Sequence, residues 1–138
     1  MAAKVPPKNT PDDVLDNARQ LFLHTKGYRN YIPPSAPSWE NMRLIVDLLA
    51  KPYGIPDRII FSPEGELGAY FFSSEGYVAL HVVDGGDIIV GIYCIGDRIR
   101  DVVEINPESA TLQIDLEGFL GTYYTALEME CGAEGAVD

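Results

Sequence analysis

The chain has 138 residues, of which 46% are hydrophobic and 22% charged, and its formal charge at pH 7 is −11. This length and composition predict one globular domain over residues 1–138. Ten basic residues against 21 acidic ones argue against a protein that binds nucleic acid or anionic membranes, since both kinds of partner need clustered Lys and Arg.

The chain is expected to be cytoplasmic and to hold no metal. No apolar run approaches the roughly 20 residues that span a bilayer, and residues 1–11 lack the apolar centre of a signal peptide. Cys94 and Cys131 are too few for a disulfide framework, which favours a reducing compartment. His24 and His81 add no spacing typical of a zinc site.

Helical periodicity follows a proline-containing segment, residues 1–10, which we expect to be a loose arm. Thr10 and Pro11 have the chemistry of a helix start, and Gly27 that of a helix end. The residues expected to face the core from this helix are Val14, Leu15, Ala18, Leu21, Phe22 and Thr25.

A second helix is expected after an aromatic, proline-rich loop at residues 28–37. Ser38 is its predicted N-cap, and Pro52 and Gly54 are expected to end it. Its predicted core-facing stripe is Met42, Ile45, Val46 and Leu49.

From Arg58 onward the hydrophobic period changes from 3.6 to 2, which predicts short strands. The turns are too short for parallel crossovers, so neighbouring strands should be antiparallel. A last helix is expected over residues 116–131, followed by a frayed tail at 133–138. These elements predict an α+β fold, a two-layer sandwich in which helices cover one face of an antiparallel sheet. The expected strands are at about 58–62, 67–74, 77–83, 87–95, 99–105 and 111–115.

The predicted hairpins bring several chemically interesting side chains to one face of the sheet. A tight turn at Gly85-Gly86 sets Tyr77 opposite Cys94 and His81 opposite Val90. A turn at Glu75-Gly76 sets Tyr70 opposite His81. The strip on this face comprises Tyr70, Phe72, Tyr77, His81 and Cys94. The opposite face, expected to be a dry core, comprises Phe71, Val78, Leu80, Val82, Ile89 and Ile95.

His81 and Cys94 are the residues of this strip that most invite a catalytic interpretation. In the predicted register they lie four residues apart along the ladder, roughly 13 Å at the strand rise. A nucleophile and its base need a separation of about 3 Å. A direct catalytic pair is therefore not expected.

Two segments resemble the S-adenosylmethionine decarboxylase family. Residues 61–68 read Phe-Ser-Pro-Glu-Gly-Glu-Leu-Gly, similar to the family's Phe-x-Pro-x-Gly-x-x-Gly turn. Residues 75–81 read Glu-Gly-Tyr-Val-Ala-Leu-His, similar to its Glu-Ser-His-x-x-Ile-His segment. The family's serine cleaves its own backbone and becomes a pyruvoyl group, whereas Gly76 has no side chain that could attack. The resemblance thus implies the fold, and a relative that forms no pyruvoyl cofactor.

The resemblance also implies candidate site residues. His81 matches the histidine that assists self-cleavage, and Cys94 lies near the family's catalytic cysteine, so these two are the candidate catalytic residues. The candidate residues for binding a ligand such as S-adenosylmethionine are Glu75, Gly76, Tyr77, Tyr70 and Phe72. The family's first strand would fall on residues 20–25, where the periodicity predicts helix instead.

Each candidate has a purely structural alternative. His81 could be a buried, hydrogen-bonded histidine, and Cys94 a small hydrophobic residue. Glu75 and Gly76 could make a hairpin turn that needs positive φ, and the aromatic residues could simply pack.

Three functions follow as hypotheses. The first is a non-processing relative of the decarboxylases, related to polyamine metabolism, that binds a small molecule or regulates a partner. The second is a pyruvoyl-independent lyase acting on S-adenosylmethionine, with Glu75, Tyr77 or His81 as its base. The third is an acidic protein-interaction module. In each case the aromatic strip faces outward and is expected to be buried against another subunit, so a homodimer or higher oligomer is expected.

Overall fold

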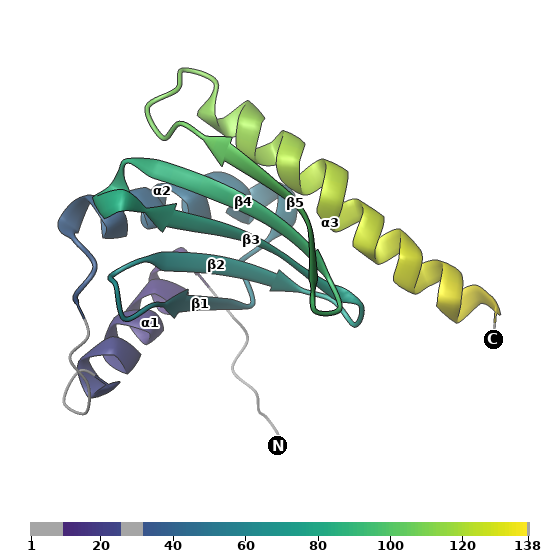
Figure 1. The fold of residues 1–138 in the computed structure, drawn as a ribbon, viewed down its shortest axis with the longest axis horizontal. Helices are drawn as coiled ribbons and strands as arrows, with labels where there is room; N and C mark the ends of the chain where they lie inside the picture. Colours follow the sequence, from purple (N-terminus) through teal and green to yellow (C-terminus); the bar gives the residue numbers. More distant parts are fainter. Residues whose placement is uncertain (1–9, 26–31, 138) are drawn as a thin grey trace.

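The structure is a computed structural model that describes residues 10–25 and 32–137, without the side chains of Thr25 and of residues 125–137. The described residues contain five strands and three α-helices. Figure 1 shows their arrangement. In chain order the elements are α1 (Pro11–Thr25), α2 (Ala36–Tyr53), β1 (Arg58–Phe61), β2 (Leu67–Phe72), β3 (Gly76–Val83), the 3-10 turn η1 (Asp84–Gly86), β4 (Ile88–Ile95), β5 (Arg98–Ile105) and α3 (Leu112–Val137).

The strands form one antiparallel meander in the order β1-β2-β3-β4-β5. Sequential neighbours pair because every connection within the sheet is too short for a crossover. The helices pack on one side of it: α1 lies against β1, α2 against β2 and β3, and α3 against β3 and β5. The predicted α+β two-layer sandwich is confirmed. None of the described helices is both long and apolar enough to cross a membrane.

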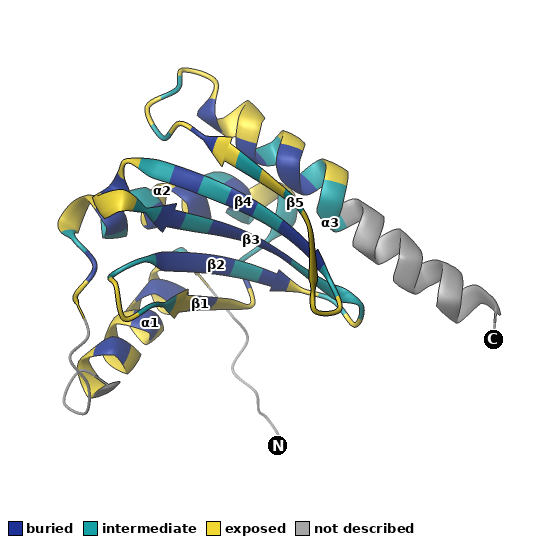
Figure 2. Cartoon of the chain, viewed as in Figure 1, coloured by how far each residue is buried: buried dark blue, intermediate teal, exposed yellow. Residues whose placement is uncertain are grey.

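The core lies between the helices and the sheet face that they cover. Buried residues alternate with half-buried ones along most of β4, whereas β2 and β3 each bury three residues in a row. Figure 2 shows the burial of each residue on the ribbon. The predicted dry face is confirmed, with Ile95 only partly buried at its margin. The largest fully buried side chains are Met42, Ile45, Leu49, Leu67, Leu80, Ile89, Leu116 and Leu120.

Residues 20–25 belong to helix α1, as the periodicity predicts, and not to the strand that the family resemblance implies. Thr10 caps the helix, because its Oγ1 accepts a hydrogen bond from Asp13 N at 3.1 Å. The expected inward position of Leu21 is wrong, since its side chain is 54% exposed. Residues 1–9 and Gly27, the predicted arm and helix end, lie outside the described residues.

Helix α2 begins earlier than predicted. Its N-cap is Ser35, whose Oγ accepts a hydrogen bond from Ser38 N at 3.2 Å, so Ser38 lies within the first turn. The predicted cap is wrong because Pro37 can occupy the first turn of a helix, where its missing N–H costs nothing. The predicted stripe is buried, and Gly54 ends the helix with φ 91°.

The predicted sixth strand at 111–115 is wrong, because helix α3 begins at Leu112. The apparent alternation of Leu112 and Ile114 is the source of the error. Leu112 is buried, whereas Ile114 is 70% exposed, and Leu112 lies one helical turn before the buried Leu116. The helix also continues through Val137, in place of the expected frayed tail.

Candidate functional site

The sheet face that points away from the helices is the candidate site, and we call it the open face. Strand registers place its side chains in three rows that cross four or five strands, and a short fourth row, Val83 and Ile88, joins only β3 and β4. The middle row is Arg58, Tyr70, Ala79, Ile92 and Val102. The rows on either side are Phe72, Tyr77, Cys94 and Ile99, and Ile60, Gly68, His81, Val90 and Glu104.

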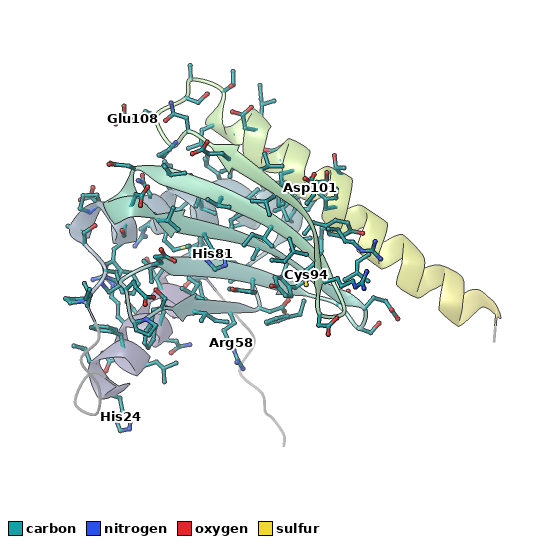
Figure 3. All side chains as sticks on the ribbon, viewed as in Figure 1. His24, Arg58, His81, Cys94, Asp101 and Glu108 are labelled. Atoms are coloured by element: carbon teal, nitrogen blue, oxygen red, sulfur yellow. The ribbon has the colours of Figure 1, made fainter. Side chains whose placement is uncertain are left out.

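The open face is mainly apolar, although no described helix packs on it. Apart from Arg58, His81 and Glu104, it consists of aliphatic and aromatic residues with one cysteine and one glycine. Its outer apolar side chains, Ile60, Phe72, Ile99 and Val102, are between 39% and 59% exposed. All five strip residues predicted from the sequence lie on this face; Figure 3 labels two of them, His81 and Cys94.

The structure brings Tyr70 and His81 together, although in a different register from the predicted one. Tyr70 pairs with Ala79, and His81 pairs with Gly68. The β2–β3 connection holds three residues, 73–75, so the predicted pairing is wrong by two positions. A shift of two keeps every side chain on its face. His81 therefore lies diagonal to Tyr70, with Tyr70 Oη 2.8 Å from His81 Nε2.

Gly68 leaves the space in which these two rings meet. A Cβ at Gly68 would lie 2.9 Å from ring carbons of both His81 and Tyr70. Burial lowers the pKa of His81 and raises the pKa of Tyr70. Both groups are therefore neutral at pH 7, and their hydrogen bond joins two uncharged rings.

Tyr77 and Cys94 face each other, and His81 faces Val90, as predicted. The connection is the 3-10 turn and Asp87 instead of a two-residue turn, but it has the same centre and so gives the same register. Burial, with the Cys94 thiol and then Tyr70 adding to it, raises the pKa of Tyr77 to about 12. The buried Cys94 Sγ donates to the carbonyl oxygen of Gly96 at 3.6 Å.

Tyr70, Phe72 and Tyr77 form an aromatic cluster at one end of the open face. The centroid of the Tyr70 ring lies 5.8 Å from that of Phe72 and 5.1 Å from that of Tyr77. Phe72 and Tyr77 meet edge to face at 6.3 Å. Such a cluster offers π faces for stacking or cation binding.

The register keeps His81 and Cys94 four ladder positions apart. This corresponds to roughly 13 Å along the strands, beyond hydrogen-bond reach. His81 Nε2 already has Tyr70 Oη as its partner. His81 and Cys94 therefore do not form a direct pair, and the catalytic roles implied by the resemblance remain predictions.

Gly76 is required by a close backbone approach and not by the positive φ suggested for a hairpin turn. Gly76 begins strand β3 and does not have a positive φ. A Cβ there would overlap the carbonyl oxygen of Cys94 and lie 2.8 Å from Ile95 Cα. Beside it, the carbonyl oxygen of Glu75 accepts from Gly96 N at 2.7 Å. A serine at position 76 does not fit this hairpin.

Sequence reasoning missed Ile60, Ile99, Val102, Arg58 and Glu104 as parts of the site. The alternation in β5 would place Ile99 on the same face as Asp101. A register shift between Tyr93 and Cys94 instead sets Ile99 opposite Cys94, and Asp101 opposite Tyr93. Asp101 thereby faces helix α3, where it accepts a hydrogen bond from Tyr123 Oη that raises the pKa of Tyr123.

Grooves also occur at the margins of the two layers. One of about 550 Å³ runs between β5 and α3, beside Phe119 and Tyr123. Another of about 570 Å³ lies between η1, the start of α2 and the loop at 106–108. Within the described residues, no group of three or more His, Cys, Asp or Glu side chains could hold a metal ion.

Comparison of the chain with protein-family models, with curated proteins and with solved structures found no match. The function proposed below therefore rests on the geometry of the open face.

The structure predicts that Gly76→Ser destabilises the fold. The added side chain collides with backbone atoms of β4, which cannot rotate away, so we expect a loss of about 1–3 kcal/mol in the free energy of unfolding. Urea denaturation followed by circular dichroism measures it. The control is Gly118→Ser, because Gly118 in α3 has open space around its Cα. Equal stability of Gly76→Ser and the wild type would contradict the close approach.

Burial of neutral His81 predicts a pH-dependent stability. The pKa of His81 is lowered in the folded state, so its contribution is complete above the unfolded value of about 6.5 and is lost as pH falls through the folded pKa. Between pH 7.5 and 5, the wild type should therefore lose more of its free energy of unfolding than His81→Gln, whose side chain does not titrate. Urea denaturation at both pH values tests this, and identical losses would refute it.

Proposed function

We propose that this chain is a non-catalytic protein-interaction module whose open face binds a partner. The observation that carries the proposal is an apolar sheet face with no described helix over it. A solvated face of an antiparallel sheet is normally polar. Exposed apolar patches of this kind mark interaction surfaces, and each large side chain buried there contributes about 1.5–3 kcal/mol.

The charge distribution supports the same function. Of 21 acidic residues in the chain, only Glu104 has a described side chain on the open face. The acidic groups on the remaining surface favour solubility, while the open face stays nearly free of charge. This separation suits a protein that remains soluble while it presents one apolar surface.

The arrangement of the ionisable residues favours binding over catalysis. Tyr70 Oη and His81 Nε2 pair with each other, and Cys94 Sγ has a backbone acceptor. Polar atoms that are already paired within the surface can enter an apolar interface without losing a hydrogen bond to water. By its resemblance to the decarboxylases, the module could regulate a related protein.

Site-specific photocrosslinking in living cells tests the proposal. A photoreactive amino acid at Phe72 or Ile99 on the open face should give crosslinked products of higher mass. The control position is Ile114 in α3, which is also a large exposed aliphatic residue but lies off the open face. Products from the open face alone support the module, and the absence of products there refutes it.

A second candidate function is the binding of S-adenosylmethionine by the aromatic cluster, and the ring geometry favours it. The ligand has an adenine that can stack and a sulfonium cation that aromatic faces attract. The chain's charge of −11 suits a cationic ligand.

Isothermal titration with S-adenosylmethionine tests this candidate. We expect binding by the wild type, and binding at least about tenfold weaker for Phe72→Ala, which removes one exposed ring of the cluster. Phe72 is 42% exposed, so its truncation should leave the fold intact. No heat with the wild type would exclude the candidate.

A further inference from the structure

We infer that the partner of the open face is a second copy of this chain, packed face to face so that Arg58 of each subunit meets Glu104 of the other. This inference rests on the proposed function, because it names the occupant of the same surface. Three features support it: the charges of the face, their positions in the rows, and the symmetry of a homodimer.

The open face is electrically self-complementary. Arg58 lies on edge strand β1 and Glu104 on the opposite edge strand, β5. Both are exposed, and neither forms an ion pair with another described residue. The charges of Arg58 and Glu104 sum to zero, although the formal charge of the whole chain is −11. The open face is thus a surface at which two copies can approach without the repulsion that acts between their acidic surfaces.

Symmetry leaves two simple ways to stack two copies of this face. A two-fold dimer uses the same patch on both subunits, and its axis lies in the plane between the two sheets. An axis across the strands would lay β1 on β1 and set the two Arg58 side chains against each other. An axis along β3 lays β1 of one subunit over β5 of its partner. Only the second arrangement brings opposite charges together.

The row positions place this pair within reach. With the axis along β3, Arg58 lies over Val102 of the partner subunit, because both belong to the middle row. Glu104 of the partner subunit lies in the next row, about 7 Å along the strand. A long, flexible Arg side chain spans such a distance. The symmetry forms the pair twice, once at each edge of the interface.

The centre of the face suits close packing of two sheets. Ala79 lies in the middle row of the central strand, on the axis, and its side chain does not protrude. The taller side chains of Tyr70 and Ile92 flank it in the same row. Sheets that pack face to face lie about 10 Å apart, with their strands within roughly 30° of each other.

The size of the face predicts a dimer of modest affinity. Five strands and three rows span about 24 Å by 20 Å at ordinary strand spacings. This footprint, about 480 Å² per subunit, is smaller than that of stable, specific interfaces and lies in the range of weak, transient complexes. We therefore expect a dissociation constant in the micromolar range, and an association that is visible across ordinary working concentrations.

Sedimentation equilibrium of the full chain, from about 1 to 200 μM at low ionic strength, tests the inference with a charge swap. The wild type should form dimers. Arg58→Glu and Glu104→Arg should each raise the dissociation constant at least about tenfold, because each opposes like charges at both edges. The double variant Arg58→Glu/Glu104→Arg should restore wild-type association. Circular dichroism should show that all variants fold, since both residues are exposed.

Two further variants separate this inference from the proposed function. Val102→Asp on the open face should abolish the dimer, and Ile114→Asp in α3 should leave it unchanged. A monomer at every concentration would overturn the inference, whereas crosslinks from the open face to a different protein would then keep the interaction module. The pairing of Arg58 with Glu104 would be overturned if the single charge-swap variants left the dissociation constant of the dimer unchanged. It would also be overturned if the double variant failed to restore wild-type association.

Discussion

The central strand β3 links the two sides of the sheet, because one of its faces packs against the helices and the other belongs to the open face. Val78, Leu80 and Val82 point into the helical layer and are fully buried. The residues between them point to the open face. Strand geometry links the two sets, since a shift of one residue would exchange them. The helical core therefore also fixes which side chains form the open face.

Connection length explains why the helices cover only one face. The five strands follow each other through short turns, so within the sheet the chain has no room for a crossover helix. Helices α1 and α2 precede the sheet, and α3 follows it. The described fold consequently has an apolar face on each side of the sheet and one helical layer. The surplus apolar face is the physical basis of the function proposed above.

The hairpin between β2 and β3 explains how this chain differs in chemistry from the family that it resembles. Gly76 lies against the carbonyl oxygen of Cys94, at the position where the family has its serine. The space that a reactive side chain would need is filled by backbone. His81 is held by Tyr70, and Cys94 lies far along the ladder. These contacts consolidate the sheet and its surface.

Local patterns in the chain are enough to predict the fold class, the two N-terminal helices and the face to which Tyr70, Tyr77, His81 and Cys94 belong. Local periodicity encodes these features, because side chains alternate with period 2 in strands and 3.6 in helices. The remaining features depend on contacts between elements that are distant in the chain. The length of a turn set the β2–β3 register, and residues 112–115 are helical because Leu112 and Leu116 pack together against the core. The bulge at Tyr93 and Cys94 turned Ile99 toward the open face, which no local pattern encodes, since a bulge depends on how two strands meet.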